Sequence, residues 1–165
     1  MNALEMALKM ETDAVQFYTE ASQKAKFSVG KKMFLAVAAD EERHHDMIAQ
    51  IIKGLHVTPK DVSPLKNVKS IFETMKNEMT KKIEASTDEV EAFKIAMRME
   101  KEGIEYYEKA MTKSMKPKEK EFLALLINEE KQHYAIFSDT YEYLAKTGRW
   151  FLWEESPIRS MVEGG

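Results

Sequence analysis

The sequence predicts an all-α fold in which a four-helix bundle is built from two helical hairpins joined by one long crossover. The 165 residues include only six glycines and four prolines but 32% charged residues, a composition typical of long amphipathic helices. Apolar residues recur at helical spacing in four long segments. The links inside each pair of segments are short, whereas the link between the pairs is long, which is the connectivity of a bundle with one crossover.

The first hairpin is defined by a start signal and a break. Asn2 followed by Glu5 is typical of a helix start, and the helical spacing continues through residues 2–27. Residues 28–30 are expected to break this helix. A second helix is expected to follow and to end before Gly54, a residue type that favours the position just after a helix.

The crossover and the second hairpin follow from similar signals. Residues 55–65 contain two prolines and are expected to be irregular, whereas residues 68–83 are expected to form a short amphipathic helix. A capping box at residues 86–89 is expected to begin the third long helix. Pro117 suits the first position of the fourth helix, which is expected to end near Gly148.

One domain is expected, with the bundle over residues 1–148 and an irregular tail, residues 149–165, that packs on the bundle or on a partner subunit. The net charge of −3 gives no electrostatic case for nucleic-acid binding. No long apolar stretch or signal-peptide pattern occurs, so we expect a cytoplasmic protein with no membrane partner. Cysteine is absent, which excludes thiolate metal sites and iron–sulfur clusters within this chain.

An internal repeat points to the chemistry. A segment of the first helix matches a segment of the third at a constant offset of 89 positions, which pairs Glu11 with Glu100 and Tyr18 with Tyr107. In the second and fourth helices, AADEERHHDMI matches LINEEKQHYAI at an offset of 88 positions. Each half therefore supplies one glutamate on its first helix and a Glu-x-x-His motif on its second.

These polar side chains fall within apolar helical stripes, where unpaired carboxylates would be costly to bury. Two divalent cations would compensate their charge. The three-residue spacing places Glu and His on one helix face, and carboxylate with imidazole favours iron or manganese. The predicted ligands are Glu11, Glu42, His45, Glu100, Glu130 and His133.

The choice of residues within the second helix depends on the repeat. Glu41 and His44 have the same spacing and lie on an equally apolar face. At an offset of 88 positions, the counterpart of His44 is Gln132. Glu42 and His45 are therefore preferred as ligands, and His44 is expected at the surface or just outside the ligands.

These residues, with the duplicated MET…FY and MEK…YY surroundings, resemble rubrerythrin-like members of the ferritin-like di-iron family over residues 3–146. The resemblance implies a ferritin-like bundle, two iron ions (or manganese or a mixed pair), bridging by Glu42 and Glu130, a homodimer, and reaction with hydrogen peroxide or dioxygen. Two departures are Gly103, where the family usually carries a further glutamate, and the missing cysteine-ligated rubredoxin module. An external electron donor such as a rubredoxin is therefore expected.

Tyr18 and Tyr107 lie two helical turns beyond the glutamates of their own helices. They are candidates for hydrogen bonding to ligand carboxylates, with ordinary core packing as the alternative. The catalytic candidates are therefore Glu42, Glu130, Tyr18 and Tyr107. An alternative function is iron binding or ferroxidation without peroxide turnover. A metal-free interaction bundle would leave the six inward polar groups unexplained.

Overall fold

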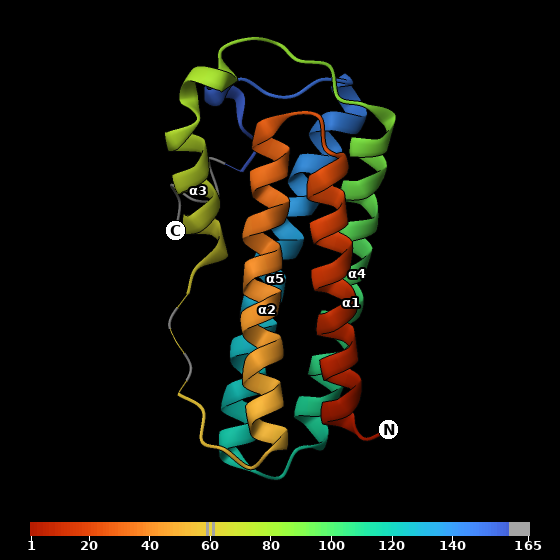
Figure 1. Ribbon diagram of the computed structural model, residues 1–165, viewed down its shortest axis with the longest axis vertical. Coiled ribbons are helices and arrows are strands. Elements are labelled where there is room, and N and C mark those ends of the chain that lie inside the picture. The colour runs from red at the N-terminus through yellow and green to blue at the C-terminus, as the bar shows by residue number, and fades with distance from the viewer. Residues whose placement is uncertain (59, 61, 159–165) are drawn as a thin grey trace.

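The computed structural model describes residues 1–58, 60 and 62–158, and these form a helical bundle with one long crossover, as predicted (Figure 1). Helix α1 packs along α2, and α4 packs along α5, while the crossover carries the short α3 beside the bundle. None of the described helices is long and apolar enough to cross a membrane. The elements in order are α1 (Ala3–Lys24), α2 (Ser28–Ile52), α3 (Pro64–Thr74), η1 (Lys76–Met79), α4 (Thr87–Lys113), α5 (Pro117–Thr147) and η2 (Trp153–Glu155).

Most helix ends lie where the local sequence predicts them. The side chains of Asn2 and Ser86 each accept a hydrogen bond from a backbone N–H three residues later, which completes both capping boxes. Pro117 is the first residue of α5. Gly54 and Gly148 follow the ends of α2 and α5 with φ of 78° and 73°, a left-handed conformation that favours glycine.

The predicted break at residues 28–30 is wrong, because the turn lies at residues 25–27 and α2 already begins at Ser28. Two backbone N–H groups of the turn donate to the buried carboxylate of Glu89 on α4, which fixes the turn there. Gly30 is helical. A Cβ atom at this position would lie 2.9 Å from the ring of Trp150, so the glycine permits close packing instead of a turn.

The crossover helix is shorter than the predicted range of residues 68–83. It begins at Pro64, after a Ser63 side chain that accepts a backbone hydrogen bond, and it ends at Thr74. The later part of the range contains the 3-10 helix η1 and then leaves the helical path. At its end, the Ile83 carbonyl accepts a hydrogen bond from the backbone N–H of Trp150 in the tail, at 2.7 Å, so pairing with the tail replaces the last turn of the predicted helix.

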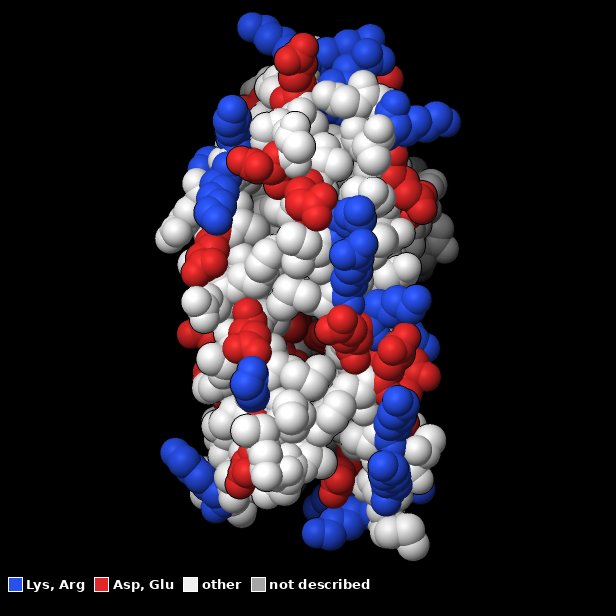
Figure 2. All heavy atoms as spheres, turned by 90° about the vertical axis from the view of Figure 1, so that its right-hand side faces the viewer, with Lys and Arg blue, Asp and Glu red and all other residues white. Residues whose placement is uncertain are grey.

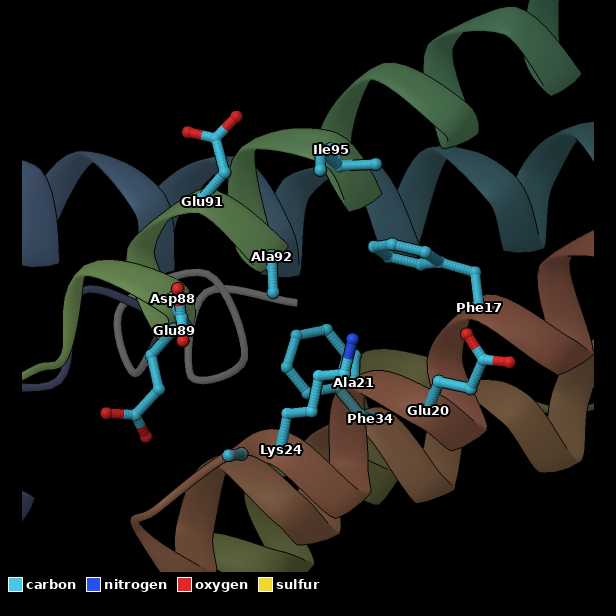
Figure 3. Close-up of a pocket in the computed structure, with 11 residues that line it drawn as sticks. Phe17, Glu20, Ala21, Lys24, Phe34, Asp88, Glu89, Glu91, Ala92 and Ile95 are labelled. Carbon is cyan, nitrogen blue, oxygen red and sulfur yellow. The ribbon is translucent and has the colours of Figure 1, made fainter.

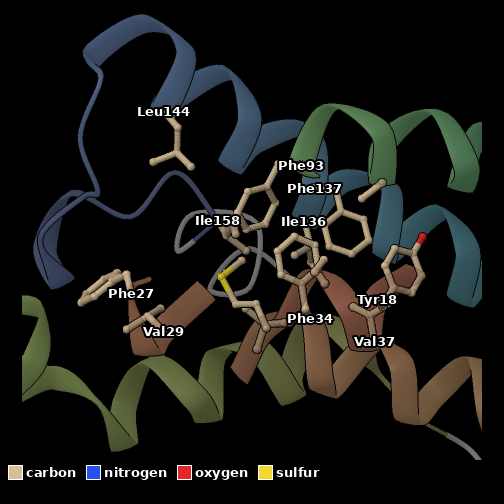
Figure 4. Packing of buried hydrophobic residues seen from close by; sticks show 14 of the residues in the cluster. Tyr18, Phe27, Val29, Phe34, Val37, Phe93, Ile136, Phe137, Leu144 and Ile158 are labelled. Atoms are coloured by element: carbon tan, nitrogen blue, oxygen red, sulfur yellow. The ribbon is translucent and has the colours of Figure 1, made fainter. Parts of the chain in front are cut away.

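The larger of two apolar clusters lies in the half of the bundle that contains the α1–α2 turn, and a smaller one lies in the other half (Figure 4). Phe34 of α2 stacks on Phe93 of α4 with a ring-centroid distance of 4.6 Å and on Phe137 of α5 at 5.7 Å. Rings from three helices therefore meet at one point. This packing fixes the spacing of the helices beside the polar centre.

The C-terminal segment adds to this core from the end of the bundle. Trp150 and Phe151 are each 1% exposed, and the Trp150 ring lies 5.2 Å from that of Phe27. Ile158 is fully buried in the same cluster. The rest of the predicted tail, residues 159–165, lies outside the described residues.

Candidate metal centre

The middle of the bundle contains two groups of buried carboxylates and imidazoles that share two members. In each group, one ligand atom from every residue lies within 4.8 Å of the others. Each helix of the two hairpins contributes, with one glutamate from α1 or α4 and a Glu-x-x-His pair from α2 or α5. The groups are Glu11, Glu41, His44 and Glu130, and Glu41, Glu100, Glu130 and His133.

The shared residues, Glu41 and Glu130, lie between the two histidines. The Nδ1 atom of His44 lies 3.4 Å from Glu130 Oε1 and 3.5 Å from Glu41 Oε1. The Nδ1 atom of His133 lies 3.2 Å from Glu41 Oε1 and 3.7 Å from Glu130 Oε1. Two ions held in these groups would therefore have two carboxylates in common, one from each half of the repeat.

The structure corrects the prediction for the second helix. Glu42 is exposed, and the side chain of His45 is 35% exposed with Nδ1 3.2 Å from the exposed Asp46. Adjacent residues on a helix point about 100° apart, so Glu41 and His44 face the centre in their place. Glu41, and not Glu42, is therefore the glutamate of α2 that belongs to both groups. The structure brings together the other four predicted ligands, Glu11, Glu100, Glu130 and His133.

The donor atoms fit a pair of metal ions. Six buried atoms, one from each residue of the two groups, have no hydrogen-bond partner among the described residues. An unpaired buried polar atom is costly, and metal coordination would satisfy it. Four carboxylates and two neutral imidazoles balance two divalent charges. The atoms are Glu11 Oε2, Glu41 Oε1, His44 Nδ1, Glu100 Oε2, Glu130 Oε1 and His133 Nδ1.

Two further carboxylates, which the sequence reasoning missed, hold the histidines. Asp40 Oδ2 lies 2.8 Å from Nε2 of His133, and Glu129 Oε1 lies 3.0 Å from Nε2 of His44. A proton on each Nε2 leaves each Nδ1 free to coordinate a metal, a common arrangement of ligand histidines. Each outer carboxylate immediately precedes a shared glutamate, and both hydrogen bonds join one half of the repeat to the other.

A single guanidinium joins the two outer carboxylates. Arg43 donates to both carboxylate oxygens of Glu129, and its Nη2 also lies 3.5 Å from Asp40 Oδ1. Burial raises the pKa of Glu129, but hydrogen bonds from His44 and Arg43 outweigh this effect and keep that pKa below its usual range. Arg43 therefore helps to keep Glu129 charged as an acceptor for the imidazole.

The hydrogen bonds of Tyr18 and Tyr107 also connect the two halves of the repeat. The hydroxyl of Tyr18 donates to Glu100 Oε1 at 2.7 Å, and that of Tyr107 donates to Glu11 Oε1 at 2.5 Å. Burial, together with the nearby carboxylates, raises the pKa of both phenols well above its usual value. Both therefore remain protonated donors, and each leaves the second oxygen of its glutamate available to a metal.

Substitution of Tyr18 and Tyr107 by phenylalanine is expected to weaken metal binding about tenfold, because each ligand glutamate loses its orienting hydrogen bond. Metal titration of the apo-protein measures the affinity. Tyr106→Phe is the control, since the Tyr106 hydroxyl donates to the backbone oxygen of Ala3 instead, at 2.7 Å. Equal affinities in all variants would assign the two buried tyrosines to packing alone.

The metal-free centre holds protons on several groups. Burial, followed by repulsion from Glu41, raises the pKa of Glu11 to about 8, and burial also raises that of Glu130 well above its usual range. Burial lowers the pKa of His44 and His133, but the surrounding carboxylates outweigh it and raise both. Burial raises the pKa of Glu41, but the two adjacent histidines outweigh this effect and hold that pKa well below its usual range.

Metal binding is therefore expected to release protons and to strengthen as the pH rises towards about 8, the pKa of Glu11. Metal affinity increases with pH because the raised pKa values keep protons on groups that must lose them to coordinate a metal. Calorimetric titration with Mn²⁺ in two buffers of different ionisation enthalpy measures the number of protons released. Binding heats that do not depend on the buffer would contradict this expectation.

The family model described as Rubrerythrin matches residues 2–141, a range that contains every member of both groups. Neither a curated protein nor a solved structure matches the chain.

Proposed function

Because the chain belongs to the rubrerythrin family, we propose that it is a non-haem di-iron protein that reduces hydrogen peroxide, or reacts with dioxygen, with electrons from an external donor. The observation that carries the proposal is the pair of ligand groups sharing Glu41 and Glu130, with six buried donor atoms that lack partners among the described residues. Carboxylate-rich ligation with one imidazole per ion suits iron or manganese and differs from the thiolate-rich or closed sites of structural zinc.

Two Fe(II) ions, when bound, supply two electrons that with two protons convert one hydrogen peroxide into two waters, leaving two Fe(III) ions. The chain's residues prepare the site for this chemistry. Glu11 and Glu100 are oriented by tyrosine hydroxyls, and the histidines by Asp40 and Glu129. Burial excludes bulk water from the ligand atoms.

The electrons must be returned from outside this sequence, which contains no cysteine and therefore no thiolate-bound iron of its own. The proposed partner is a small redox protein such as a rubredoxin. This donor would have to supply two electrons for each hydrogen peroxide reduced.

Purification without oxygen, followed by metal analysis and visible spectroscopy, tests the proposal. We expect about two irons per chain and rapid oxidation when hydrogen peroxide is added to the Fe(II) form. Faster oxidation by dioxygen than by peroxide would instead favour a ferroxidase, the second candidate. Absence of a stoichiometric transition metal, with no uptake of added Fe(II), would overturn both.

A further inference from the structure

A cavity of about 130 Å³ lies between α1 and α4, and the four glutamates of the two ligand groups line it. We call it the α1–α4 cavity. Its twelve lining residues form six pairs, and the members of every pair are 89 positions apart in the sequence. The cavity is therefore formed equally by the two halves of the repeat, and it faces both ligand groups alike.

Carboxylates line the cavity from its outer edge to its floor. Asp13 and Glu102 form the exposed pair at the edge, whereas Glu11, Glu100 and the two shared glutamates are buried. Figure 2, which views this side of the molecule, shows a hollow near the middle of the face with acidic atoms inside it and on both sides. The Oε2 atoms of Glu11 and Glu100 are buried and have no hydrogen-bond partner among the described residues.

The walls of the cavity are kept open by two small residues, Ala14 and Gly103, which form one of the six pairs. A Cβ atom at Gly103 would lie 3.1 Å from Glu130 Oε2. Any side chain at this position would therefore press against a glutamate shared by both ligand groups. The missing side chain leaves room between α4 and the centre.

We propose that the α1–α4 cavity is the route by which divalent metal ions enter the centre. The inference rests on the metal centre proposed above. The exposed carboxylates at the edge and the buried ones behind them give an arriving cation oxygen ligands, and hard divalent ions favour such ligands. Lys9 partly neutralises Asp13 through an ion pair of 2.9 Å, whereas Glu102 forms no ion pair among the described residues. Glu102 therefore contributes most of the negative charge at the edge.

A second cavity between the same helices provides a matched comparison (Figure 3). It is larger, about 290 Å³, and lies towards the α1–α2 turn between residues such as Phe17 and Ala92. None of its lining residues belongs to either ligand group. Its edge also has exposed acidic residues, among them Glu20 and Glu91, together with the exposed Lys24, and none of them leads to the centre.

Stopped-flow mixing of apo-protein with Co²⁺, followed by visible absorption, measures the rate of entry. The double variant Asp13→Asn/Glu102→Gln is expected to bind Co²⁺ about 3- to 10-fold more slowly at low ionic strength, with unchanged stoichiometry and a difference that shrinks as salt is added. The control Glu20→Gln/Glu91→Gln makes the same change in net charge and is expected to keep the wild-type rate. Equal rates in the wild type and both variants, or equal slowing in both variants, would overturn the proposed route.

Narrowing the cavity gives a second test that does not depend on charge. Gly103→Val is expected to slow Co²⁺ entry at high as well as low salt, whereas Ala92→Leu, which fills the other cavity, is expected to have no effect. Entry into Gly103→Val at the wild-type rate would also overturn the route. Failure of the wild-type protein itself to bind two ions would overturn the metal centre, which is a separate outcome.

Discussion

Replacing Glu41 by alanine is expected to abolish binding of a metal pair, with a loss of affinity well beyond the roughly 10- to 100-fold cost of losing an outer hydrogen-bond partner. Glu41 belongs to both ligand groups, and its Oε1 atom lies 3.5 Å from His44 Nδ1 and 3.2 Å from His133 Nδ1. Its removal therefore takes one ligand from each ion. Metal content after reconstitution with Fe(II), measured per folded chain, checks the result.

The neighbouring residue offers a matched control. Glu42→Ala removes the same side chain from the exposed face of the same helix and is expected to retain two ions per chain. His44→Ala and His45→Ala make a second matched pair, with loss expected only for His44, which is fully buried. Loss of metal from the Glu42 variant with retention in the Glu41 variant would reverse the assignment of the ligand face.

Replacing Trp150 by alanine is expected to cost about 3–5 kcal/mol of unfolding free energy, the range found for large aromatic residues removed from a core. Trp150 is 1% exposed, and its ring lies 5.6 Å from that of Phe93 and 5.8 Å from that of Phe151. Its ring also packs against α2 at Gly30, which has no side chain to fill the space that the ring would leave. Chemical denaturation of the metal-free protein measures the effect.

The other tryptophan of the chain is the control. Trp153 is partly exposed, and its recorded cation–π contact is with Lys76, at 4.8 Å from the ring centroid. We expect Trp153→Ala to cost less than about 1 kcal/mol. Similar costs for the two substitutions would show that the tail does not close the core in solution.

The helices could be predicted from the sequence because their ends depend on local chemistry. The capping boxes at Asn2 and Ser86 and the glycines after α2 and α5 act through residues close in the sequence. The turn between α1 and α2 could not be placed in this way. Its position depends on Glu89 of a distant helix, and Gly30 is explained only by the ring of Trp150.

The ligand face of α2 was misassigned because its sequence contains two consecutive glutamates and two consecutive histidines. An offset of 88 positions aligns Glu42 with Glu130 and also Ile48 with Ile136, so the local match is good. Keeping the offset of 89 found between α1 and α4 would have paired Glu41 with Glu130 and His44 with His133. A shift of one residue rotates the chosen face of the helix by about 100°, so the chosen side chains point to solvent instead of to the metal centre.

The same offset of 89 pairs Asp40 with Glu129, so the outer carboxylates also had a signal in the sequence. Their partners could not be predicted, because each carboxylate bonds the histidine of the opposite hairpin. The role of Arg43 could not be predicted from the repeat, because no arginine lies at the matching position of the second half. Its counterpart at this offset, Gln132, accepts hydrogen bonds from the crossover at Ser63 and Leu65 instead.

The direction of the supporting hydrogen bonds has a consequence for folding. Tyr18, Tyr107, Asp40 and Glu129 each hold a ligand that belongs to the other hairpin. A hairpin folded alone would therefore carry ligands without the groups that orient them, and a fully supported centre arises only when the two hairpins dock. Bound metal ions therefore stabilise the contact between the two hairpins. Removal of the metal should weaken this contact before any helix unfolds.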